Sequence, residues 1–115
     1  MKIQLMVIGY VGSTKLFTGD GKPSVLNIDL ASNTRIGDQE VTDWTRVKVW
    51  YERAEKLAPH VKKGDLLLVQ GRPEVKGFAR KDGSIGADLV LHSSEVVFLG
   101  AKKHAAEENQ EDAEN

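Results

Sequence analysis

The chain has no cysteine among its 115 residues. This absence excludes a disulfide framework, a thiolate metal site and a cysteine nucleophile. Long apolar runs are also missing, because no stretch approaches the ~20 residues that a membrane-spanning helix needs. The partly apolar segment 1–9 has no small-residue cleavage site, so it is not interpreted as a signal peptide. The sequence predicts a soluble, cytoplasmic protein.

Motifs that carry catalysis are absent as well. His60, His92 and His104 do not have the spacing of metal ligands. The sequence contains neither a phosphate-binding G-x-x-x-x-G-K-[ST] loop nor a nucleophile elbow. We therefore expect no enzyme, no metal and no cofactor, and we interpret His92 as a structural residue.

The composition is that of one globular domain, with 40% hydrophobic and 29% charged residues. The charge is uneven: residues 1–100 carry a net +2 and residues 101–115 a net −3. The last 15 residues contain no apolar side chain larger than alanine, so they cannot contribute a core face. The sequence predicts a folded domain over 1–100 and a short, acidic, flexible tail over 101–115.

Short apolar runs separated by turns indicate strands. A first strand covers 3–11, where Gly9 and Gly12 break or bend it, and a second shows alternation over 26–30. A polar loop over 33–40 leads to a third strand over 41–51. Segment 52–61 has helical spacing, and Pro59 is expected to end or distort that helix.

The second half of the chain predicts a hairpin and a closing strand. A fourth strand begins at Leu66, and Asp82-Gly83 is a strong hairpin signal before a last strand over 87–99. Three strands, a helix, then two more strands match a known order. The sequence predicts an all-β fold with one short helix, a five-stranded OB-fold Greek-key barrel.

The segment 44–51 is the most informative part of the sequence. Side chains alternate between the two faces of a strand. One face would carry Thr45, Val47, Val49 and Tyr51, which suits a core. The other would carry Trp44, Arg46, Lys48 and Trp50, which suits base stacking beside phosphate-neutralising charge. The alternative is that one indole packs under a loop and the cations are only solvated, and this strand alone favours neither interpretation.

A second basic and aromatic patch follows in the predicted hairpin, with Lys76, Phe78 and Arg80. An exposed ring between cations again suits base stacking. The alternative is that Phe78 folds back on its own hairpin.

In this arrangement the residues resemble the bacterial single-stranded DNA-binding protein family over about residues 1–100. The likeness rests on the order and spacing of several short motifs, which are Gly9-Tyr10-Val11-Gly12, Asp20-Gly21-Lys22, Asn27-Ile28-Asp29-Leu30-Ala31, Asp43-Trp44-Thr45-Arg46-Val47, Ala54-Glu55, Val61-Lys62-Lys63-Gly64-Asp65, Val69-Gln70-Gly71-Arg72 and Phe98-Leu99-Gly100. The resemblance implies an OB barrel that binds single-stranded DNA during replication, recombination or repair, assembled as a homotetramer. It also implies a cytoplasmic, nucleoid-associated location.

The family's binding residues are carried over by position. Trp44 and Arg46 match its Glu-Trp-x-Arg-Val motif, Trp50 falls where Phe is common, and Phe78 falls where Trp is common. Lys63 matches the basic residue before the glycine of the helix-end turn. Together with the cations deduced above, the predicted nucleic-acid-binding residues are Trp44, Arg46, Lys48, Trp50, Lys63, Lys76, Phe78 and Arg80.

Three departures from the family pattern have consequences. Glu74 stands where a cation is common, so the hairpin groove is expected to be less basic. Thr45 replaces a histidine found near subunit contacts, which leaves a dimer open beside the tetramer. The sequence ends in Ala113-Glu114-Asn115, whereas the family's tail tip is acidic and then ends in Pro-Phe, so docking of replication enzymes on the tail is not expected.

Two other functions fit the same residues. The segment 90–95 also resembles primosomal replication protein N, a DNA-binding dimer that assists helicase loading. Alternatively, an OB domain could act as an assembly adaptor that binds no nucleic acid, with its indoles as anchors for a protein interface.

The tail yields a first prediction. A tethered anion beside a basic groove competes weakly with DNA, most strongly at low salt. Truncation after Gly100 is expected to leave the melting temperature nearly unchanged, to raise DNA affinity slightly and to cost little partner binding. A thermal melt, a DNA titration and a pull-down on the full and truncated chains check this. A large loss of melting temperature would show that the tail packs on the barrel.

Overall fold

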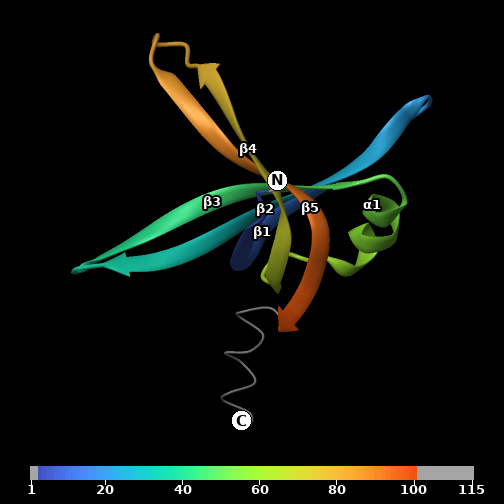
Figure 1. Cartoon of the computed structure of the whole chain (residues 1–115), viewed down its shortest axis with the longest axis horizontal. Coiled ribbons are helices and arrows are strands. Elements are labelled where there is room, and N and C mark those ends of the chain that lie inside the picture. Colours follow the sequence, from blue (N-terminus) through green and yellow to red (C-terminus); the bar gives the residue numbers. More distant parts are fainter. Residues whose placement is uncertain (1–2, 101–115) are drawn as a thin grey trace.

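The computed structural model describes residues 3–100, which form a closed barrel with the strand order β1-β2-β3-β5-β4 (Figure 1). The strands are β1 (Leu5–Gly19), β2 (Lys22–Ile36), β3 (Gln39–Trp50), β4 (Leu66–Ala79) and β5 (Ile85–Gly100). A helix α1 (Glu52–Leu57) and a 3-10 turn η1 (Ala58–His60) connect β3 to β4. β3 and β5 pair in parallel, and the other paired strands are antiparallel. The predicted all-β, five-stranded OB-fold barrel is confirmed, while the predicted tail 101–115 lies outside the described residues.

The core is built by residues that face inward at alternate positions along the strands. β2 contributes three fully buried aliphatic side chains at every second position, which confirms the alternation predicted over 26–30. The strands β1, β3, β4 and β5 also contribute to the buried cluster. Its largest members are Leu26, Ile28, Leu30, Val47, Val49, Leu67, Val69 and Leu91. The inner face takes these aliphatic residues, while the outer face carries polar, aromatic and some exposed aliphatic side chains.

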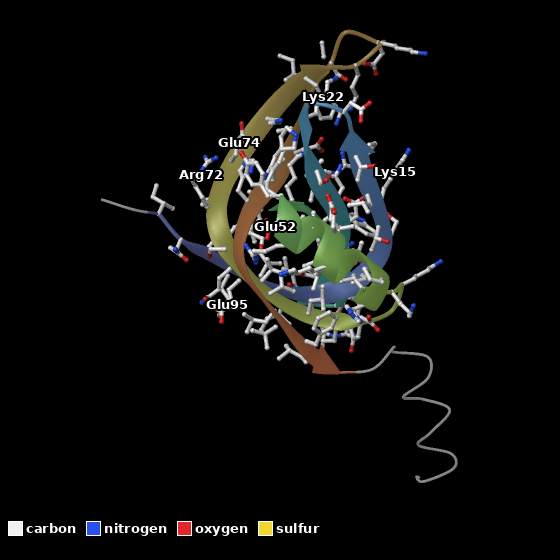
Figure 2. All side chains as sticks on the ribbon, turned by 90° about the vertical axis from the view of Figure 1, so that its right-hand side faces the viewer. Lys15, Lys22, Glu52, Arg72, Glu74 and Glu95 are labelled. Carbon is white, nitrogen blue, oxygen red and sulfur yellow. The ribbon has the colours of Figure 1, made fainter. Side chains whose placement is uncertain are left out.

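The helix lies across one opening of the barrel (Figure 2). Ala54 and Val61 are buried in the core, and Leu57 packs against it. Pro59 stands in the first turn of η1, so the α-helix ends at Leu57 and the chain tightens into the 3-10 turn. The predicted distortion at Pro59 is therefore confirmed.

Two local predictions were wrong. Segment 33–40 is not a loop: β2 and β3 stay paired from Asn33–Thr42 to Ile36–Gln39, around a turn at Gly37 with a φ of 62°. Tyr51 is not a core residue, because it is 66% exposed. β3 ends at Trp50, and Tyr51 takes a positive φ of 62° to start the helix, so the alternation of the strand stops one residue earlier.

The first strand also extends further than the predicted 3–11. It passes through Gly12 by a register shift between Val11 and Ser13, after which it continues to Gly19. Val11 is buried, whereas Ser13 is exposed and donates a hydrogen bond to Asp29 on the outer face. The bulge therefore turns the odd-numbered residues of β1 from the inside of the barrel to the outside.

Three hairpin arms project from the barrel, formed by β1–β2, β2–β3 and β4–β5 (Figure 1). The arm of β4 and β5 stays paired out to Ala79 and Ile85 and turns at Asp82-Gly83, as predicted. Arg80 N donates to Ser84 O at 2.8 Å, and the carboxylate of Asp82 accepts from Ser84 N at 3.0 Å. Most residues of these arms are exposed, so the arms extend the outer surface beyond the core.

Glycines on β4 allow a matched test of the packing. A Cβ at Gly71 would lie 2.1 Å from the carbonyl oxygen of His92, whereas a Cβ at Gly77 would meet nothing closer than 3.9 Å. Since the obstacle at Gly71 is backbone, Gly71→Ala is expected to lower the free energy of unfolding by roughly 1–3 kcal/mol. Gly77→Ala should change it far less. Urea unfolding of both variants checks this, and equal losses would contradict the close approach of β4 and β5 at Gly71.

Candidate nucleic-acid interface

The outer face of β3 is as the sequence predicts. Thr45, Val47 and Val49 are buried, and the residues between them point away from the core. Trp44 and Arg46 are exposed, while Lys48 and Trp50 are half-buried. The strand therefore presents two indoles separated by two cations along one surface.

Trp44 is 58% exposed and rests against β1. A Cβ at Gly12 would lie 2.7 Å from Cζ3 of the indole, so a larger residue there would displace the ring from this position. The ring also borders a shallow hollow of about 140 Å³ that is lined by Asp29, Arg46 and Asp88, among others. One side of the indole is thus supported and the other is open.

Arg46 already has a partner on β2. Its Nε and Nη2 donate to the two carboxylate oxygens of Asp29 at 3.0 and 3.3 Å. The hydrogen bond and the charge of Asp29 raise the pKa of Arg46 above its usual value. A phosphate would have to replace Asp29 to bind this guanidinium fully.

Lys48 lies in a positive environment. Its Nζ donates to Asn27 Oδ1 at 3.3 Å and lies 5.9 Å from the centre of the Trp50 ring. Partial burial lowers the pKa of Lys48, and the charges of Lys76 and Arg46 lower it further. An anion placed between these cations would relieve their repulsion, as a backbone phosphate can.

Trp50 is held by two residues that the sequence analysis did not assign to the site. Its Nε1–H donates to Nδ1 of His92 at 3.2 Å, and the two rings are stacked with 6.2 Å between their centres. Nε2 of His92 is 2.6 Å from Oε1 of Glu74. Because an indole only donates, Nδ1 accepts and Nε2–H donates to the carboxylate.

The hydrogen bond from His92 holds the pKa of Glu74 below its usual value, and nearby Lys76 and Arg72 act in the same direction. Glu74 is thus the charged end of a chain of contacts that orients Trp50. No sequence signal pointed to this chain, since its members lie on β3, β5 and β4 and are brought together only by the barrel.

Phe78 and Arg80 lie on the β4–β5 arm. The Phe78 ring covers Gly86 of β5, where a Cβ would come within 2.6 Å of its Cζ, and the ring is still 42% exposed. The Arg80 guanidinium carbon lies 5.4 Å from the ring centre, and Nη1 donates to Ile85 O at 2.9 Å. The ring thus lies on its own hairpin, as the alternative interpretation has it, and keeps an open face.

The other two predicted cations are placed differently. Lys76 is exposed on β4 and close enough to Lys48 to lower its pKa. Lys63 lies on the turn between η1 and β4, next to Gly64, whose N–H donates to Val11 O at 2.8 Å. The barrel therefore brings Lys76 to the surface of β3, β4 and β5 but leaves Lys63 outside it.

Two further findings concern residues 3–100. None of their helices has the length and apolar character to cross a membrane. Over the same range, no three His, Cys, Asp or Glu side chains are grouped as metal ligands would be.

The contact between His92 and Trp50 gives a prediction for the free protein. In a Trp44→Phe background, Trp50 is the one remaining tryptophan of the two in the sequence. His92→Ala removes both its acceptor and its stacking partner, so acrylamide should quench its fluorescence more strongly. His60→Ala, which changes an exposed histidine of η1, is the control and should have no effect. Equal quenching in both variants would show that His92 does not hold the indole.

Comparisons with known proteins cover nearly all the described residues. A model of the single-strand binding protein family matches residues 3–99. The single-stranded DNA-binding protein of Chlamydia pneumoniae is 30% identical over 111 residues, covering 90% of this chain and 69% of that protein. Its counterpart in Chlamydia caviae is 32% identical over 93 residues, covering 79% of this chain and 57% of that protein.

The fold is also found among solved structures. The Plasmodium falciparum SSB complex with ssDNA superposes with a TM-score of 0.66 at 23% identity, covering 84% of this chain and 94% of that one. At 23% identity, this structural match supports the barrel fold alone. The family model, in contrast, matches residues 3–99, which are nearly all the described residues. The chain belongs to the single-strand binding protein family.

Proposed function

We propose that the chain binds single-stranded DNA with little preference for sequence. The observation that carries this proposal is the outer face of β3, where Trp44 and Trp50 flank Arg46 and Lys48 on a surface with no role in the core. The names of the relatives from Chlamydia support it. The structural neighbour, solved with ssDNA, has the same fold.

In this proposal, aromatic rings bind the bases and cations bind the phosphates. Bases stack on Trp44, Trp50 and Phe78, each contributing roughly 1–3 kcal/mol. Phosphates lie against Lys48, Lys76 and Arg80, and against Arg46 when a phosphate replaces Asp29. Stacking uses the π-face that every base has, so this surface tolerates any sequence. Lys63 would act separately, if the strand continues around the barrel.

The biological setting is part of the same proposal. Such a protein would coat exposed strands in the cytoplasm during replication, recombination or repair, without catalysing a reaction. The family match and the bacterial relatives support this setting. The folded domain would end near residue 100, with 101–115 as an acidic tail.

We also propose that the chain assembles with copies of itself, as a tetramer or as a dimer. A row of apolar side chains lies on the outside of β1, β4 and β5, where Ile8 pairs with Leu68 and Leu68 with Val97. Met6 and Ile8 are exposed, as is Val97. Such a strip is typical of an interface between subunits.

Tryptophan fluorescence tests DNA binding directly. Adding oligo-dT at low salt should quench the emission of the full chain, because bases would contact Trp44 or Trp50. Trp50→Ala should weaken binding by roughly 1–3 kcal/mol. The control Val75→Ala changes an exposed residue on the other face of β4 and should leave the affinity unchanged.

The same titration at two salt concentrations tests the cations. Lys48→Ala should flatten the salt dependence by up to about one unit, whereas Lys56→Ala on α1 should not. Unchanged emission of the full chain with oligo-dT would contradict the proposal and favour the assembly adaptor. Native mass then separates a tetramer from a dimer of the primosomal replication protein N type.

A further inference from the structure

A second aromatic and cationic pair stands on the β1–β2 arm, outside the surface described so far. Lys15 Nζ lies 5.0 Å from the centre of the Phe17 ring. Phe17 is 43% exposed, and Lys15 projects outward from β1 (Figure 2). Neither residue contributes to the buried core.

The pairing of the strands places this pair on the same face as the proposed site. Phe17 pairs with Val25, and Val25 pairs with Trp50. In the next row of the same face, Lys15 pairs with Asn27, and Asn27 pairs with Lys48. Residues that pair across antiparallel strands project to the same side. Phe17 and Lys15 therefore continue the rows that contain Trp50 and Lys48.

Side-chain contacts agree with this placement. Ser13, two residues before Lys15, donates to Asp29 at 3.3 Å, and the same carboxylate holds Arg46. Lys48 donates to Asn27, which is the partner of Lys15 in the ladder. The bulge at Gly12 is the cause, because without it the odd residues of β1 would continue to face the core.

The chemistry of the pair matches two others on this surface. Lys48 lies over Trp50 at 5.9 Å and Arg80 over Phe78 at 5.4 Å. A cation beside an exposed ring offers both parts of a nucleotide a partner, since the base stacks on the ring and the phosphate meets the charge. A protein partner covering Phe17 would instead have to bury the Lys15 ammonium or supply it with an acid.

We propose that Phe17 and Lys15 form an additional nucleotide-binding site, which extends the bound strand from Trp50 onto the β1–β2 arm. The base stacks on Phe17, and Lys15 moves on its flexible stem from the ring to the adjacent phosphate. This inference rests on the proposed function, because the ligand is the same single strand. It adds a site that neither the sequence pattern nor the residues carried over from the family include.

The test compares oligo-dT near the two ends of the ~4–16 nucleotide range that one OB domain covers. Phe17→Ala should weaken binding of the long oligonucleotide at least about five-fold and leave binding of the short one nearly unchanged. Ile36→Ala is the matched control, because it removes an exposed apolar side chain at the tip of the β2–β3 arm.

Charge is tested on the same arm. Lys15→Ala should flatten the salt dependence for the long oligonucleotide by up to about one unit. Lys22→Ala should leave the slope of the salt dependence unchanged, because Lys22 lies on the opposite face of β2 from Val25 and Asn27.

A direct reporter guards against loss of folding. Phe17→Trp in a Trp44→Phe, Trp50→Phe background places one tryptophan at the new site, and long oligo-dT should quench it. If the unchanged chain and Phe17→Ala bind the long oligo-dT with equal affinity, this inference is overturned and the proposed function still stands. The same holds if long oligo-dT binds but does not quench the tryptophan of Phe17→Trp. A change of native mass in Phe17→Ala at unchanged affinity would also overturn it, and would assign the arm to an interface between subunits. Failure of the unchanged chain to bind any oligo-dT would overturn both.

Discussion

The bulge at Gly12 determines how the outer surface is assembled. One extra residue in β1 moves its odd-numbered side chains from the core side, up to Val11, to the outer side, from Ser13 onward. The absent Cβ of Gly12 also leaves the space in which Trp44 rests. A larger residue here would displace the indole, because its Cβ would lie 2.7 Å from Cζ3 of Trp44. The position of Trp44 on the outer face therefore depends on a neighbouring residue that carries no side chain.

Charge on this face is largely balanced before any ligand arrives. Asp29 is paired with Arg46, and the carboxylate of Glu74 accepts a hydrogen bond from His92 and adds a negative charge near Lys48 and Lys76. Lys48 and Lys76 remain, and partial burial together with the charge of Lys76 lowers the pKa of Lys48. Affinity should then depend more on stacking than on counterion release, since few cations are free to neutralise phosphates without exchanging a partner. A weak net charge on the whole chain is consistent with such a surface.

Alternation within a single strand could be predicted from the sequence, but contacts and register shifts between strands could not. The faces of Trp44 and Val47 followed from a period of two, and the turn at Asp82-Gly83 from its dipeptide. The outward turn of Phe17 could not be predicted, because glycine at position 12 is equally consistent with a break, a bend or a bulge. His92 gave no signal because its role needs β3 and β4 on either side of β5. Segment 33–40 looked like a loop because an arm exposed on both faces has no apolar period.

Three aromatic residues of the proposed site are each held from one side by a different device. Trp44 rests against Gly12, Phe78 covers Gly86, and Trp50 is stacked on and hydrogen-bonded to His92. In each case the support restricts the rotamers of the ring while part of its surface stays open. Restricting a side chain before binding lowers the entropy lost when a base stacks on it. Glycine achieves this for Trp44 and Phe78 by allowing direct contact with backbone, where any Cβ would push the ring away. In the proposed function, the barrel would contribute to binding through the stiffness of its outer rings as well as through their number.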